Sequence, residues 1–229
     1  MRAAVCVWLA IAAAAGGCDS RAPGTAAREQ EAAFVARCEA LPHAPVEVVP
    51  IPIRVTRDET RPHAELTGMY ERARADHATM GLTQTNVGYE TAVRLSGLKD
   101  ASGRRTCLRA AIRVSLSMRP LTVFVARELA DDECRRDAVR EHEAKHVAVY
   151  EAHLRESAAR LAVALPQAFG GRLVHAASVA DGQAEIEAEL ARFLDDFIAG
   201  EAQRLAERQS AVDSPAEYAR VAAACTAAR

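Results

Sequence analysis

Residues 140–154 read REHEAKHVAVYEAHL and set three histidines among several carboxylates in a segment with helical spacing. His142, Glu143 and His146 form the pattern HExxH. Residues i and i+4 project from the same side of a helix, so both imidazoles can reach one metal ion. Glu143 is turned about a quarter of a turn from His142, where it can accept a proton from a water molecule without binding the metal. The pattern therefore predicts a zinc site with a general base beside it.

The burial expected for this helix opposes one of two simpler interpretations of the histidines and leaves the other open. Both histidines share an apolar stripe with Val139, Val149 and Leu161. A charged face in contact with solvent would lie opposite that stripe, so the spacing argues against it. Core histidines satisfied by hydrogen bonds alone remain the alternative.

The surrounding chain predicts an α+β fold in which a small antiparallel sheet packs on the HExxH helix. That helix is expected over about residues 132–165, with Asp131 or Asp132 as its N-cap and Pro166 at its end. The three strand candidates before it are separated by turn signals, and they span residues 86–97, 106–118 and 121–128.

Four further elements extend this fold. A first helix is expected over residues 27–41, and an edge strand or extended arm with two prolines over residues 45–56. A second long helix is expected over about residues 182–209. The segment DSPAEY, residues 213–218, has a capping residue followed by proline, so it opens a last helix that carries Cys225.

The N-terminal sequence MRAAVCVWLAIAAAAGGCDS is typical of an export signal, because an apolar run follows Arg2 and ends in small residues. Its ending AGGC resembles the lipobox of bacterial lipoproteins, which implies a signal peptide over residues 1–17 and lipid on Cys18. A plain secretory signal is the alternative. Residues 18–26 would be a tether and residues 27–229 one domain, and Asp19 favours retention at the inner membrane. The expected location is the periplasmic side of the cell envelope.

Composition restricts the class of protein further. The 229 residues suit one domain, and 50% apolar residues can supply a core. The net charge of −2 provides no basic face, so nucleic acid is not an expected partner.

Export also affects the interpretation of the cysteines. Four of them, Cys38, Cys107, Cys134 and Cys225, lie in the expected domain, and an oxidising compartment favours two disulfides with three possible connectivities. Chain order favours Cys38–Cys225, which would join the terminal helices, and Cys107–Cys134, which would join the sheet to the HExxH helix.

Residues 80–155 resemble the zincin metallopeptidases, of the gluzincin type. More narrowly, the run from GLTQTNVGYETAVRL to REHEAKH resembles bacterial families of predicted secreted zinc-dependent proteases. The resemblance implies a sheet packed on the active-site helix, with LTVFVARE, residues 121–128, as the strand that pairs with substrate.

The third zinc ligand is not part of the motif. Val149 and Ala152 replace the glycine and the third histidine of HExxHxxGxxH. His153 lies about 10 Å beyond His146 along a straight helix, so we expect it, with Tyr150, to surround the site without binding the metal.

Glu201 is the predicted third ligand. It falls within the apolar stripe of the helix at 182–209, where a carboxylate needs a partner, provided Gly200 does not break that helix. The alternative is that Glu201 reaches solvent or an arginine, and His175 and Asp181 are then the next candidates.

Two functions are consistent with these patterns. The first is a lipid-anchored zinc endopeptidase, a hydrolase of peptide bonds in the cell envelope, with Glu143 as general base and a peptide or protein as substrate. The second is a non-catalytic envelope lipoprotein that keeps a zincin-like scaffold for binding or structure.

Overall fold

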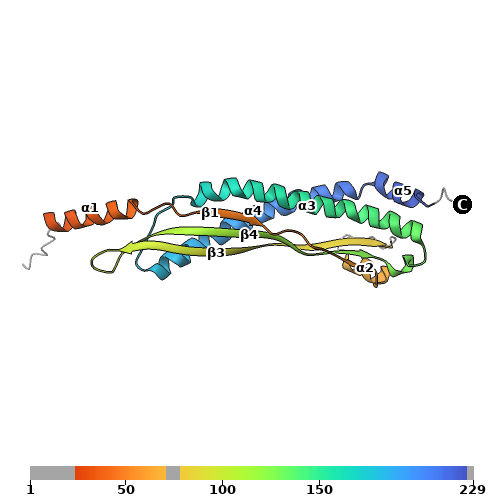
Figure 1. Cartoon of the computed structure of the whole chain (residues 1–229), viewed down its shortest axis with the longest axis horizontal. Coiled ribbons are helices and arrows are strands. Elements are labelled where there is room, and N and C mark those ends of the chain that lie inside the picture. The colour runs from red at the N-terminus through yellow and green to blue at the C-terminus, as the bar shows by residue number, and fades with distance from the viewer. Residues whose placement is uncertain (1–23, 71–77, 226–229) are drawn as a thin grey trace, which may run out of the picture.

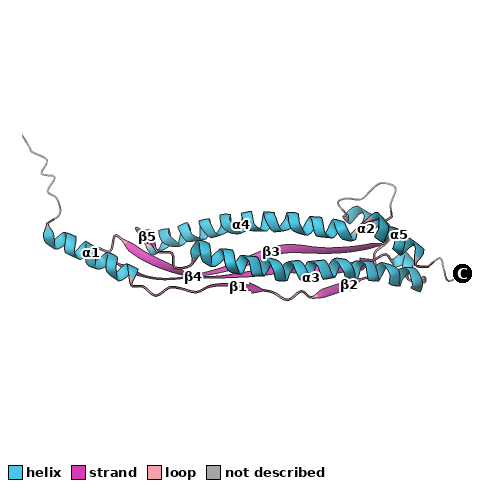
Figure 2. Ribbon diagram, turned by 90° about the horizontal axis from the view of Figure 1, so that it is seen from above, coloured by secondary structure: helices cyan, strands magenta, loops and turns pink. Residues whose placement is uncertain are grey.

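Two long helices lie side by side and antiparallel along a long, narrow sheet (Figures 1 and 2). The structure is a computed structural model that describes residues 24–70 and 78–225. The expected signal peptide and Cys18 lie outside these residues. The helices are α1 Thr25–Glu39, α2 His63–Met69, η1 Arg127–Leu129, α3 Glu133–Phe169, α4 Val179–Val212 and α5 Pro215–Ala223. The strands are β1 Val46–Pro50, β2 Val55–Asp58, β3 Gly81–Lys99, β4 Thr106–Val125 and β5 Val174–Ala176.

The α+β class is confirmed, but the sheet is mixed and not antiparallel. The central strand, β4, pairs along its length with β3 in an antiparallel hairpin. Along its other edge β4 pairs in turn with β5, β1 and β2, and the last two run parallel to it. The segment predicted as an extended arm at 45–56 therefore contributes to two strands, β1 and β2, and each of them joins the sheet by pairing with β4.

The predicted turn at Arg119 and Pro120 is wrong, because β4 continues through both residues to Val125. The partner strand shifts register between Thr85 and Val87, opposite this point. A bulge leaves a residue outside the hydrogen-bond ladder, so the sheet accommodates a proline there that cannot donate a backbone hydrogen bond.

One face of β4 forms the core beneath the two helices. Ile112, Val114, Leu116 and Met118 are buried in a cluster with residues of α3 and α4, among them Leu161, Leu165, Leu190 and Leu194. The opposite face carries ion pairs such as Arg113–Glu47. This alternation is typical of a sheet with one solvated face.

Helix α3 begins as predicted, with the side chain of Asp132 accepting a hydrogen bond from the backbone of Arg135. Its predicted end at Pro166 is wrong, because the helix continues to Phe169. Leu165 and Phe169 are buried on its inner side, and this packing stabilises the last turn despite the proline.

Helices α4 and α5 form close to the predicted places, but α5 ends at Ala223 and does not reach Cys225, which was expected on it. Helix α4 passes through Gly200 without a break, and Ser214 caps α5 through a bond from the backbone of Glu217, with Pro215 in the first turn. In the described part of the chain, no helix has the length and apolar character that crossing a membrane requires.

Two disulfides are present, but the predicted pairing is wrong: the bonds join Cys38 to Cys107 and Cys134 to Cys225. The terminal helices α1 and α5 lie at opposite ends of the molecule, so Cys38 and Cys225 cannot meet (Figure 1).

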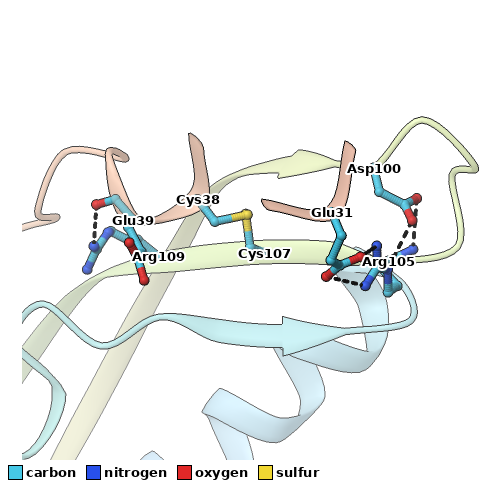
Figure 3. The surroundings of a disulfide bond; sticks show 7 residues. All are labelled: Glu31, Cys38, Glu39, Asp100, Arg105, Cys107 and Arg109. Atoms are coloured by element: carbon cyan, nitrogen blue, oxygen red, sulfur yellow. Dashed lines mark hydrogen bonds and ion pairs between the residues drawn. A yellow bond between two sulfur atoms is a disulfide. The ribbon is translucent and has the colours of Figure 1, made fainter. Parts of the chain in front are cut away.

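Helix α1 is instead fastened to the start of β4 (Figure 3). Around the Cys38–Cys107 bond, Arg105 pairs with Glu31 and Asp100, and Arg109 donates to the backbone carbonyl of Glu39. Both cysteines are fully buried.

Candidate metal centre

His142 and His146 lie one helical turn apart on α3 and are both buried. Their Nε2 atoms are 3.3 Å apart, and the rings are nearly perpendicular to one another. The two imidazoles therefore converge, as the HExxH spacing predicts.

Asp213 completes this group from the turn between α4 and α5. Its Oδ1 atom lies 3.3 Å from Nε2 of His142 and 3.1 Å from Nε2 of His146. One ligand atom from each of the three residues lies within 4.8 Å of the others, so the group could hold a metal ion.

Glu201, the predicted third ligand, is not at this site. It is 2% exposed, as its place in the apolar stripe indicated, but its carboxylate accepts hydrogen bonds from Ser157, Arg160 and Arg204. Its partner is thus arginine and not a metal.

The antiparallel register of the two helices explains why. Gln209 contacts His146, so the carboxylate that reaches the histidines must come from the end of α4. Glu201 precedes Asp213 by twelve residues, or about 18 Å along a helix, and meets α3 at Ser157 instead.

His153 is also absent from the metal group. It is 1% exposed in the core, with its Nε2 atom 3.5 Å from Oε2 of Glu201. Tyr150, one turn after His146, does line the cleft described below. The other candidates, His175 on β5 and Asp181 in the first turn of α4, lie at the far end of both helices.

A second layer of side chains orients the two imidazoles. Nδ1 of His146 lies 2.6 Å from Oε1 of Gln209, and Nδ1 of His142 lies 3.4 Å from Oε1 of Glu217. With each proton assigned to Nδ1 by these acceptors, both Nε2 lone pairs face Oδ1 of Asp213. Three electron-rich atoms then converge on one point, which favours a cation there.

The pKa shifts of the site residues are consistent with a cation at this centre. Without a metal ion, a protonated imidazole can donate from Nε2 to Oδ1 of Asp213 in place of the cation. Burial alone would raise the pKa of Asp213, but such hydrogen bonds with His142 and His146 outweigh it and hold that pKa well below the usual range. The bond to Asp213 raises the pKa of His142 above that of a free histidine. The site thus concentrates negative charge beside two imidazoles, as a cation site requires.

Glu143 lies next to the metal group but takes no part in it. Its side chain is 3% exposed, and its Oε2 atom accepts a hydrogen bond of 2.7 Å from Oγ1 of Thr83 on β3. Burial raises the pKa of Glu143, and the hydrogen bond from Thr83 and the nearby imidazoles only partly offset that effect. A buried carboxylate with a raised pKa beside a cation site is suited to accepting a proton.

Helix α5 supports the centre from the C-terminal side. The hydroxyl of Tyr218 donates to Oδ1 of Asp213 at 2.9 Å, and its ring lies 5.7 Å from that of His142. Glu217 is held by Lys145 at 2.7 Å and by Arg220 at 2.8 Å. The Cys134–Cys225 bond then ties the end of α5 to the first turn of α3.

We expect the two disulfides to affect metal binding differently. Each closes a long loop, with separations of 69 and 91 residues, so loss of either should cost about 4 kcal/mol of unfolding free energy. Replacing Cys134 and Cys225 by alanine also frees α5, and should weaken metal binding about 10- to 100-fold.

The matched control replaces Cys38 and Cys107 by alanine, at the opposite end of the molecule. Metal titrations of the two folded double variants compare the bonds. Equal affinities in both variants would contradict the supporting role of α5.

A cleft of about 1530 Å³ opens over the metal group. Its walls come from the start of β3, from the first half of α3, from the end of α4 and from α5. The lining residues include Met80, Leu82, Thr85, Val139, His142, Glu143, His146, Leu205, Asp213, Tyr218 and Val221.

The strand predicted to pair with substrate is buried within the sheet. Residues 121–124 of β4 pair with β2 on one side and with β3 on the other, so no edge is left for another chain. Among the described strands, β3 pairs with β4 alone. In the described part of the chain its outer edge at residues 81–85 is therefore unpaired with any strand, and these residues line the cleft.

Sequence reasoning did not identify Asp213, Gln209, Tyr218 or Glu217 as site residues. Asp213 opens DSPAEY, a segment whose capping pattern indicates only the start of a helix. No sequence pattern identifies it, because its place beside the histidines depends on how the two long antiparallel helices align.

Comparisons of the chain with protein-family models, with curated proteins and with solved structures find no match. The function is therefore inferred from the site.

Proposed function

We propose that this protein is a zinc-dependent peptidase. The observation that carries the proposal is the triangle formed by Nε2 of His142, Nε2 of His146 and Oδ1 of Asp213, with sides of 3.3, 3.3 and 3.1 Å. Ligands of a tetrahedral zinc ion, at about 2.0–2.1 Å, stand about 3.3 Å from one another. Three protein ligands leave a fourth position open, as catalytic zinc sites do.

Bound zinc would supply Lewis-acid chemistry, polarising a carbonyl and making water more acidic. Glu143 would act as general base and accept a proton from the attacking water. The water oxygen then forms a bond to the carbonyl carbon, the C–N bond breaks, and the amine leaves with a proton returned by Glu143.

The free edge of β3 supports a peptide as the substrate. An extended chain laid on this edge would hydrogen-bond to the backbone of residues 81–85, the strand that also contacts Glu143. Apolar side chains on the cleft walls, among them Met80, Leu205 and Val221, favour substrates with apolar side chains beside the cleaved bond.

The cell envelope is the proposed place of action, on the strength of the lipobox-like sequence before Cys18. The two disulfides agree with it, because such bonds persist in oxidising compartments. Lipid on Cys18 would hold the enzyme at the periplasmic face of the membrane.

The test is peptide hydrolysis by the purified protein with and without zinc. Cleavage of an unfolded protein such as reduced casein should appear with one zinc ion per chain, disappear after chelation and return with zinc. Tight zinc binding without cleavage of any peptide in a diverse library would oppose the peptidase and favour the non-catalytic envelope lipoprotein.

A further inference from the structure

The first residue of β3 lies directly against Glu143. A Cβ atom built on Gly81 would stand 2.4 Å from Oε1 of Glu143 and 2.6 Å from Cγ1 of Val139. Real Cβ atoms essentially never come so close to other atoms, so a side chain at position 81 must displace Glu143 and Val139, or the strand itself. Gly81 does not have a positive φ, so the missing side chain is explained by space and not by backbone conformation.

Thr83, two residues along the same strand, contacts the other carboxylate oxygen. Its Oγ1 atom donates to Oε2 of Glu143 at 2.7 Å. Residues two apart on a strand project to the same face, so Gly81 and Thr83 approach Glu143 from one side. The hydrogen bond also offsets part of the cost of burying this carboxylate.

The sheet fixes the place of this strand end. Gly81 pairs with Val125 and Thr83 with Val123 of β4, which is itself paired on both edges. The backbone of Ala126 donates to the carbonyl of Met80 at 2.8 Å. The approach of β3 to Glu143 is therefore set by the sheet.

We propose that Gly81 and Thr83 are positioning residues for the general base. The Thr83 hydroxyl holds Oε2, and the space left by Gly81 admits the carboxylate in one orientation. This inference rests on the proposed peptidase function and adds to it a link between base and substrate. Strand β3, which would align the peptide, also contacts Glu143, the residue of α3 that would activate water. The peptide and the general base would therefore be placed by the same rigid strand.

The rate of reaction depends on such placement. A general base must stay within hydrogen-bond reach of the proton it accepts. Displacement by about 1 Å can cost about 100-fold in rate. Neither Gly81 nor Thr83 belongs to the metal group, so their loss should leave zinc affinity unchanged.

Thr83→Val and Thr83→Ser test the hydrogen bond. In the zinc-loaded enzyme we expect Thr83→Val to lower kcat about 10- to 100-fold with little change in KM, and Thr83→Ser to restore most of it. Thr91→Val, on an exposed part of the same strand, is the matched control.

Gly81→Ala and Gly88→Ala test the close approach. A Cβ on Gly88 would meet its nearest atom at 3.9 Å, an ordinary contact, so this control measures the effect of an added methyl group on β3 alone. We expect kcat to fall about 100-fold in Gly81→Ala and to stay near the wild-type value in Gly88→Ala.

The decisive readout does not depend on activity. Crystal structures of the metal-free variants should show the Glu143 carboxylate displaced in Thr83→Val and Gly81→Ala, and in its wild-type position in Thr83→Ser and Gly88→Ala. An unmoved carboxylate in the first two, or a displaced one with unchanged kcat, would overturn this inference. A wild-type protein that cleaves no peptide would refute the peptidase, while the carboxylate position would still decide the positioning role.

Discussion

Asp213→Ala should weaken zinc binding by more than about 100-fold and abolish any zinc-dependent activity. Removing a residue that only hydrogen-bonds to a metal ligand already lowers metal affinity about 10- to 100-fold, and removing the ligand itself should lower it more. Asp213 is the carboxylate whose oxygen closes the triangle with Nε2 of His142 and His146. Without it, two imidazoles alone would hold the ion.

Competition titration with a zinc-binding dye measures the affinity directly. Thermal unfolding provides a second measurement, because a ligand at 100 times its Kd stabilises the folded state by about 2.7 kcal/mol. Zinc at a concentration that raises the Tm of the wild-type protein should leave that of Asp213→Ala unchanged.

Two controls distinguish a ligand from a general effect of charge on α4. Asp196→Ala removes an exposed carboxylate of the same helix and should not affect zinc binding. Glu201→Gln removes a buried one and should lower stability, since Arg160 and Ser157 lose a charged partner, but should leave the zinc affinity of the folded protein intact. An undiminished affinity in Asp213→Ala would refute the proposed metal centre.

The parts of this site that could be predicted from the sequence are those that depend on local spacing. His142, Glu143 and His146 lie within five residues, so the geometry of one helix determines which way they point. The burial of Glu201 followed from the apolar stripe of α4 by the same reasoning.

Contacts between distant segments could not be predicted in this way. Whether a buried carboxylate meets a metal or Arg160 depends on the register of α4 against α3, which periodicity does not report. The same holds for the cysteines, since chain order does not reveal that α1 and α5 lie at opposite ends of the molecule. It holds again for β1 and β2, which pair parallel with β4 from some 66 residues away in sequence.

Glu143→Gln should separate metal binding from catalysis. The proposed base contributes through proton transfer, and loss of a general base typically lowers kcat about 10²- to 10⁴-fold. Glu143 is outside the group of His142, His146 and Asp213, so zinc should bind as in the wild type. Glutamine keeps the shape of the side chain, and its carbonyl oxygen can still accept the hydrogen bond from Thr83.

The stability of this variant argues for the same role. Burial raises the pKa of Glu143, so its charged form is unfavourable in the folded protein. A neutral glutamine removes that cost, and the free energy of unfolding of metal-free Glu143→Gln at neutral pH should equal or exceed that of the wild type. A residue that lowers stability and is needed only for turnover is typical of a catalytic group. One preparation of Glu143→Gln can be tested for all three properties: its stability by chemical denaturation, its zinc affinity by titration, and its kcat by peptide hydrolysis. Hydrolysis at the wild-type rate would exclude Glu143 as the base.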